Sequence, residues 1–117
     1  MKITLPNIEP GQEPVLMLNL IRFSDKKIYF EQYIPAFNRV VQQLGIEGVS
    51  VKLVSEVVSN IIADEGEQWD EIVLVEYPSA EAFITIAQSD VYRQIADPLR
   101  VAGTAELKLF MTRKIDF

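Results

Sequence analysis

The chain contains no cysteine and no histidine among its 117 residues. Without cysteine it can form neither a disulfide nor a thiolate nucleophile or metal ligand. Without histidine it lacks the side chain that most often transfers protons near neutral pH and most often binds zinc, copper or haem iron. The sequence therefore predicts a protein that uses no metal and no cofactor.

Positive charge and long apolar runs are also scarce. The chain carries 17 acidic and 11 basic residues, which gives a net charge of -6. Such a chain repels phosphate backbones and anionic lipid surfaces, so we expect neither a nucleic-acid nor a membrane partner. No apolar stretch reaches the about 18 residues that a membrane-spanning helix needs, and the first residues do not resemble a secretory signal. We therefore expect a cytoplasmic protein.

Length and composition indicate one domain preceded by a short arm. Residues 1–13 contain Pro6, Pro10 and Gly11 among polar residues and read as an N-terminal arm, which leaves residues 14–117 as a single domain. Apolar residues make up 49% of the chain, which is more than a small domain can easily bury. We expect part of this surplus to lie at a subunit interface.

Residue patterns predict four strands and two helical regions. Ser24 or Asp25 can begin a helix that ends at Gly45, and Pro35 within it either bends the helix or lies in the first turn of its main segment. Ser79 and Ser89 are typical helix N-caps. A polar, glycine-containing loop at residues 64–67 joins two strands. The expected strands are 15–23, 49–62, 70–77 and 105–113, and the expected helical regions are 25–44 and 80–100.

The element order is βαββαβ, which predicts an α+β, ferredoxin-like fold. Its four-stranded antiparallel sheet has strand order 4-1-3-2, with the helices on one face. The first strand, VLMLNLIRF, is apolar on both of its faces, although helices can cover only one. A second copy of the chain would cover the other face, so we expect a homodimer in which two sheets form an α/β barrel.

Several segments together resemble a known superfamily. These are the helix with Tyr33 and Pro35 that ends in Leu44-Gly45, the strand WDEIVLVEYPS, and the segment SDVYRQIADPLR. As a set they resemble the dimeric α/β-barrel superfamily over residues 14–113, and within it most closely the domain-of-unknown-function family 1330. The superfamily includes cofactor-independent monooxygenases, small isomerases and haem-binding proteins, and the lack of histidine and cysteine argues against haem.

Three residues are candidates for catalysis. Asn19 interrupts the apolar first strand, where it either orients a ligand carbonyl or is satisfied by neighbouring backbone groups. Tyr33 lies on the sheet-facing side of the first helix, so its hydroxyl either reaches a cavity or belongs to an ordinary core tyrosine. Glu76, late in the third strand, could act as a base, or it pairs with Lys52 or Arg113.

Tyr92 and Arg100 are candidates for ligand binding. Both follow the second helix, and Arg100 could hold a carboxylate by two hydrogen bonds or instead bind a helix end or an acidic side chain. Arg22 is expected to pair with Asp70 or Glu71, and Trp69 to serve packing or a dimer contact.

Three functions remain open from the sequence. The first is an uncharacterised homodimer that binds a small organic molecule in a pocket between sheet and helices. The second is a cofactor-independent monooxygenase or isomerase in which Asn19, Tyr33 or Glu76 moves protons. The third is a non-catalytic interaction dimer.

Overall fold

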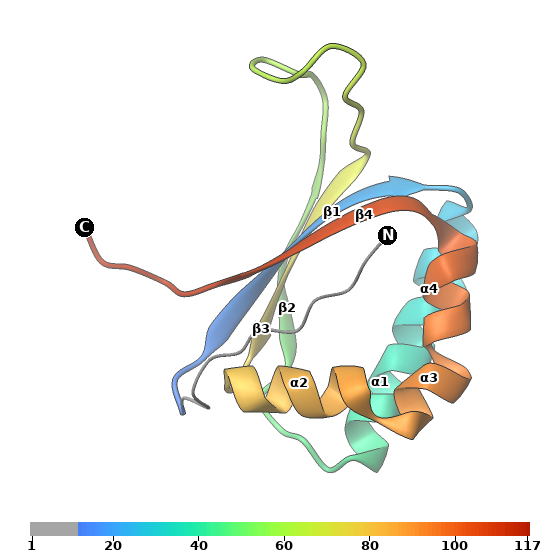
Figure 1. The fold of residues 1–117 in the computed structure, drawn as a ribbon, viewed down its shortest axis with the longest axis vertical. Coiled ribbons are helices and arrows are strands. Elements are labelled where there is room, and N and C mark those ends of the chain that lie inside the picture. Colours follow the sequence, from blue (N-terminus) through green and yellow to red (C-terminus); the bar gives the residue numbers. More distant parts are fainter. Residues whose placement is uncertain (1–11) are drawn as a thin grey trace.

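The computed structural model describes residues 12–117, so almost all of the expected N-terminal arm lies outside the described residues. The element order confirms the βαββαβ expectation (Figure 1). The strands are β1 (Val15–Phe23), β2 (Ser50–Glu56), β3 (Glu71–Tyr77) and β4 (Thr104–Thr112). The helical elements are η1 (Ile28–Tyr33), α1 (Ile34–Gln43), α2 (Ala80–Gln88), α3 (Asp90–Ile95) and α4 (Asp97–Gly103).

The four strands form one antiparallel sheet in the order β2-β3-β1-β4, which confirms the expected topology. The helices lie on one side of this sheet (Figure 1). In the central strand β1, Asn19 pairs with Val73 of β3 and with Leu109 of β4. Since paired residues point to the same face, these three side chains share the face that the helices cover.

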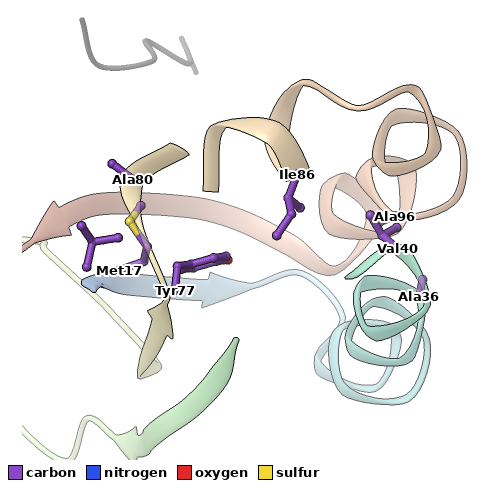
Figure 2. Close-up of a cluster of buried hydrophobic side chains, with 8 residues drawn as sticks. Met17, Ala36, Val40, Tyr77, Ala80, Ile86 and Ala96 are labelled. Carbon is purple, nitrogen blue, oxygen red and sulfur yellow. The ribbon is translucent and has the colours of Figure 1, made fainter. Parts of the chain in front are cut away.

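A buried apolar cluster joins the sheet to the helices. Met17 and Tyr77 contribute to it from the strands, and Val40 and Ile86 contribute from α1 and α2 (Figure 2). Val40 and Ile86 are almost completely inaccessible to solvent. Burying an aliphatic side chain of this size is worth about 1.5–3 kcal/mol relative to leaving it exposed, so this cluster fixes the helices against the sheet.

The first helical region begins with a turn of π-helix instead of α-helix. The Asp25 carboxylate accepts a hydrogen bond from the backbone of Ile28, and the Ile34 amide donates to the Tyr29 carbonyl, five residues back. Pro35 lies in the first turn of α1, which follows η1 directly, so the second of the two expectations for Pro35 is correct. Gly45 ends the region with a positive φ of 68°, as expected.

The second strand is shorter than the sequence predicted. It ends at Glu56, whose partner Glu71 is the first residue of β3, so residues 57–62 have no strand to pair with. The prediction of a strand to residue 62 is therefore wrong, and a long loop that projects beyond the sheet joins β2 to β3 (Figure 1). Val58, Ile61 and Ile62 of this loop are 87%, 87% and 98% exposed.

The second helical region is divided into three helices by its caps. The Ser79 hydroxyl accepts from the Ala82 amide at the start of α2, and the Ser89 hydroxyl accepts from the Tyr92 amide at the start of α3, as expected. Gly103 ends α4 against η1, where its carbonyl accepts hydrogen bonds from the amides of Ser24 and Asp25. None of the helices between residues 12 and 117 has the length and apolarity to cross a membrane.

The opposite face of the sheet carries no helix. Across its middle runs a row of apolar side chains in register, in which Leu18 pairs with both Leu74 and Phe110, and Leu74 pairs with Leu53. Leu53 and Phe110 are 49% and 48% exposed. We call these four residues the open-face row. It carries the surplus of apolar residues that the composition indicated.

Candidate functional site

A cavity of about 930 Å³ lies on the helical side of the sheet. Ligand-binding pockets typically measure about 300–1,000 Å³, so the space is large enough for a small organic molecule. Strand residues such as Met17 and Val75 form its floor, and aromatic residues such as Phe37 and Phe83 form its walls. Four of the residues singled out from the sequence line it, namely Asn19, Tyr33, Tyr92 and Arg100.

All four tyrosines of the chain line this one cavity. They come from three separate elements: Tyr29 and Tyr33 from η1, Tyr77 from the end of β3, and Tyr92 from α3. The π-helical turn begins a series of aromatic rings in contact. The ring centroids of Tyr29 and Tyr33 are 5.2 Å apart, and those of Tyr33 and Phe37 are 6.3 Å apart. Local backbone geometry thus concentrates hydroxyl groups in an otherwise apolar space.

The tyrosine hydroxyls differ in their partners. The hydroxyl oxygens of Tyr33 and Tyr92 are 3.0 Å apart and share a hydrogen bond. The hydroxyls of Tyr29 and Tyr77 form no side-chain hydrogen bond with another residue of the described chain. Neither hydroxyl oxygen is completely buried, so both are accessible from the cavity. A buried hydroxyl normally finds a partner, so two hydroxyls are left to interact with whatever fills the cavity.

All four phenols are protonated at neutral pH, and burial raises their pKa further above it. Desolvation is the main cause that raises the pKa of Tyr29, Tyr33 and Tyr77. Burial also raises the pKa of Tyr92, although the hydrogen bond with Tyr33 and the positive charge of Arg100 oppose the rise. The tyrosines are therefore hydrogen-bond donors or acids in this site, and none is a base in the resting protein.

Arg100 is fixed beside Tyr92 by Asp97. The Nε and Nη2 atoms of Arg100 both lie 2.9 Å from Asp97 Oδ1, and the Arg100 side chain is only 17% exposed. Asp97 thereby orients the guanidinium and leaves its Nη1 group for another acceptor. Arg100 thus binds an acidic side chain, as one expectation held, and also lines the cavity. Both are possible because Asp97 contacts only Nε and Nη2.

Asn19 is anchored by its own strand and by β3. Its Nδ2 atom donates to the carbonyl oxygens of Met17 and Val73, at 3.3 and 3.1 Å. These two acceptors require the nitrogen of the amide to point toward them, so Oδ1 points away from them, and no donor from residues 12–117 pairs with it. The amide is therefore satisfied by backbone on one side and offers an acceptor on the other.

Glu76 lies apart from these residues. Adjacent positions on a strand alternate between faces, so Glu76 lies on the helix-free face, where its carboxylate is 3.6 Å from Lys52 Nζ. That pair is one of the two that the sequence suggested for Glu76. The carboxylate does not line the cavity and takes no part in the site within one subunit.

The pairing predicted for Arg22 is wrong. Arg22 lies opposite Glu106 of β4 on the helix-free face, and their side chains are 3.7 Å apart. The Asp70 carboxylate instead accepts from the Phe23 amide, and Glu71 lies 2.7 Å from Lys26 Nζ. Trp69 donates to Glu67 at 2.8 Å and stacks with Lys108, so it packs at the hairpin end.

Sequence reasoning missed three residues of the cavity. Tyr77 alternates with Val73 and Val75 on β3, which was a usable signal that it faces the helices. Asp97 stands three residues before Arg100, the spacing of an ion pair on a helix. Tyr29 stands four residues before Tyr33, a spacing that was also a usable signal that the two side chains share one face of the helix. No group of acidic side chains between residues 12 and 117 is arranged to hold a metal ion.

The fold and the cavity define a class, the ferredoxin-like α+β proteins with a pocket between sheet and helices. No protein-family model matches the chain, and no curated protein matches it. Among solved structures, a Rhodopseudomonas palustris protein of unknown function is similar, with a TM-score of 0.76, 24% identity, and 92% of this chain and 86% of that chain covered.

Two further solved structures share the fold. A ferredoxin-like protein of the DABB family from Mesorhizobium loti has a TM-score of 0.55 at 9% identity, covering 90% of this chain and 100% of that chain. A proposed antibiotic biosynthesis monooxygenase from Caulobacter crescentus has a TM-score of 0.54 at 10% identity, covering 90% and 92%. Likenesses at these identities establish the ferredoxin-like fold of the chain and leave its chemistry to be argued from the site.

Proposed function

We propose that the protein is a homodimer that binds a small organic molecule in the cavity between its sheet and helices. The observation that carries the proposal is the cavity of about 930 Å³ on which all four tyrosines, Asn19 and Arg100 converge. The Tyr29 and Tyr77 hydroxyls reach the open space of this cavity, so a ligand there can pair with them. A few polar groups in an apolar pocket are typical of ligand recognition.

The dimer is supported by the helix-free face of the sheet. The open-face row is apolar, while Arg22 with Glu106 and Lys52 with Glu76 form ion pairs on the same face. An apolar centre with a charged rim is the usual anatomy of a protein interface. In a twofold dimer the open-face row of one subunit packs against the open-face row of the other, so a second copy of the chain is enough to bury this face.

Light scattering after size-exclusion chromatography tests the dimer. We expect a mass near twice the 13.3 kDa of one chain at micromolar concentration. A mass of one chain under these conditions would refute the proposed assembly.

A thermal-shift screen tests the cavity as a binding site. We expect at least one small phenol or carboxylate to raise the melting temperature with a saturable dependence on concentration, since a ligand that binds only the folded state stabilises it. A null result across both classes would argue against ligand binding and favour the alternative of a non-catalytic interaction dimer.

A cofactor-independent oxygenase or isomerase is the second candidate function. The protonated pair of Tyr33 and Tyr92 favours it, because a free hydroxyl hydrogen of this pair could stabilise and protonate a developing oxyanion, while Asn19 Oδ1 could accept a hydrogen bond from the substrate. Oxygen uptake measured with each ligand from the screen, and product analysis of the same mixtures, test it. Unchanged ligand and unchanged oxygen would leave binding alone as the function.

The finer family assignment also remains part of this proposal. We propose membership of the domain-of-unknown-function family 1330 within the dimeric α/β-barrel proteins. Two patterns support it, the aromatic-Pro-Ser stop at residues 77–79 and the set Ser89, Tyr92 and Arg93. A cytoplasmic location is a separate part of the proposal.

A further inference from the structure

We infer that the ligand of this cavity is a flat organic anion whose negatively charged oxygen, a phenolate, enolate or carboxylate, is bound by the Tyr92 hydroxyl beside Arg100. The inference rests on the proposed function, because it assumes that the cavity is a binding site. It adds the chemical class of the ligand and the group that selects it.

The charge around the cavity is opposite in sign to that of the chain. The chain has a net charge of -6, yet the charged residues that line the cavity are Arg93, Arg100 and one acidic residue, Asp97. Arg93 is largely exposed, whereas Arg100 is mostly buried. An anion is repelled by most of the surface and attracted at this opening, which favours entry of negatively charged molecules here.

Arg100 is the charged group that can meet an anion beside Tyr92. Its side chain is 17% exposed and contacts Asp97 through Nε and Nη2, which leaves Nη1 for a ligand oxygen. Its positive charge acts at the Tyr92 hydroxyl, where it opposes the rise in pKa that burial causes. A negative ligand atom beside Tyr92 would be stabilised by the same charge.

The pair of Tyr33 and Tyr92 leaves one hydroxyl hydrogen for the cavity. Their oxygens are 3.0 Å apart, and either hydroxyl can be the donor. Arg100 can only donate, so it offers no acceptor to Tyr92. When Tyr33 donates to Tyr92, the Tyr92 hydrogen is available for an acceptor oxygen of a ligand, and such a ligand favours this direction.

The cavity offers several donors without a partner. They are the hydroxyls of Tyr29 and Tyr77, one hydrogen of the Tyr33–Tyr92 pair, and the Nη1 group of Arg100. A ligand with acceptor oxygens can pair with these groups, and an oxyanion is the strongest acceptor of this kind.

The aromatic walls of the cavity favour a ligand whose apolar part is flat. The ring of Phe37 meets those of Tyr77 and Tyr92 nearly at right angles, with centroids 6.4 and 6.5 Å apart, and Phe83 meets Tyr77 in the same way at 5.2 Å. These rings therefore present both edges and faces to the cavity, and a planar ligand can pack against both. An aromatic or conjugated molecule fits these surfaces better than a branched aliphatic one.

Two chromogenic probes of nearly equal shape test the inference. 4-Nitrophenol can ionise near neutral pH, whereas 4-nitroanisole cannot ionise, and both absorb in the near ultraviolet or visible range. We expect the phenolate form to bind roughly tenfold more tightly than 4-nitroanisole, so that the bound phenol ionises at a lower pH than the free phenol. The titratable groups that face the probe are the four tyrosines, Arg93, Asp97 and Arg100. Benzoate against benzamide repeats the comparison for a carboxylate.

Variants then assign the preference to named groups. Tyr92→Phe and Arg100→Gln should each reduce the preference for the phenolate to less than about threefold while 4-nitroanisole still binds. Arg39→Gln, which makes the same change in net charge outside the cavity on α1, should leave the preference unchanged. Circular dichroism establishes that each variant is folded, and the comparison of the two probes on the unaltered protein does not depend on any variant.

Each outcome has a distinct meaning. If neither probe pair binds, the cavity is not a ligand site and the proposed function fails with the inference. If the neutral and ionised probes bind equally, or the bound phenol ionises at a higher pH, the proposed function stands and the inference is overturned. A preference for the phenolate that persists in both Tyr92→Phe and Arg100→Gln would also overturn it.

Discussion

The hydroxyl oxygens of Tyr33 and Tyr92 lie 3.0 Å apart and connect η1 to α3 across residues that are 59 positions apart in the sequence. Tyr33 is partly buried among the apolar residues of the core, and Tyr92 is the hydrogen-bond partner of its hydroxyl. The same hydrogen bond therefore serves two purposes: it holds two helical elements together and it leaves one hydroxyl hydrogen of the pair for the cavity.

Substitution of either tyrosine should lower stability. Tyr33→Phe and Tyr92→Phe each remove one partner of the shared hydrogen bond and leave the other partly buried hydroxyl without it, so we expect each to lower the free energy of unfolding by about 1 kcal/mol. Urea unfolding of both variants and of the double variant measures the coupling. Strictly additive losses would show that the hydrogen bond contributes nothing.

The tyrosines should resist titration until the protein unfolds. Burial raises the pKa of all four above the usual value of 10.0, so the unfolded chain loses these protons first. Stability is therefore independent of these groups below pH 10 and falls as the pH rises above it. We expect the tyrosinate absorbance at high pH to appear together with the loss of circular dichroism. Ionisation of a tyrosine near pH 10 in a fully folded protein would contradict the burial described above.

Gly103 should tolerate no side chain because α4 approaches η1 closely at this point. A Cβ atom added there would lie 3.0 Å from the Tyr29 amide nitrogen and 3.2 Å from its Cα, and both are backbone atoms that cannot move aside alone. We expect Gly103→Ala to destabilise the fold by about 1–3 kcal/mol. Gly45→Ala is a different case, since its cost arises from a positive φ in open space. Wild-type stability in Gly103→Ala, measured by urea unfolding, would show that the two elements are not closely packed.

A charge in the open-face row should separate the proposed dimer without unfolding its subunits. Leu74 is at the centre of the row, so Leu74→Asp places a carboxylate against the partner's apolar face. We expect the mass from light scattering to fall to that of one chain. The matched control is Ile115→Asp, because Ile115 is 77% exposed and lies beyond the last strand. A dimer that survives Leu74→Asp would locate the interface elsewhere.

The sequence predicted the sheet well because its strands follow simple rules. Alternation and a proline stop located strands, and the βαββαβ order of the elements predicted how they pair. Ser79, Ser89 and Gly45 marked helix ends through their own side-chain and backbone chemistry. The second strand was predicted too long because residues 57–62 have strand-like composition, whereas a strand also needs a partner, and β3 begins only at Glu71.

The candidate site was predicted in part for a similar reason. Asn19 and Tyr33 stood out as polar groups on apolar faces, and the structure brings them to one cavity with Tyr92 and Arg100. Glu76 was one position away from that face, a difference that strand alternation could have revealed. Tyr29 was overlooked, although its spacing of four residues from Tyr33 indicates a shared face. The π turn in η1 could not be predicted, because periodicity assumes a regular helix.

The most direct measurement uses the fact that the chain has only four tyrosines and that all of them line the cavity. Selective labelling of the tyrosine Cζ atoms with carbon-13 gives four NMR signals, which single Tyr→Phe variants assign. Titration with 4-nitrophenol should shift the signals of Tyr33 and Tyr92 saturably, with the same dissociation constant for both. If the probe binds but the tyrosine signals do not shift, the ligand binds elsewhere. If the signals do not shift at any probe concentration, the cavity does not bind the probe. Either result would contradict the claim that this cavity is the binding site.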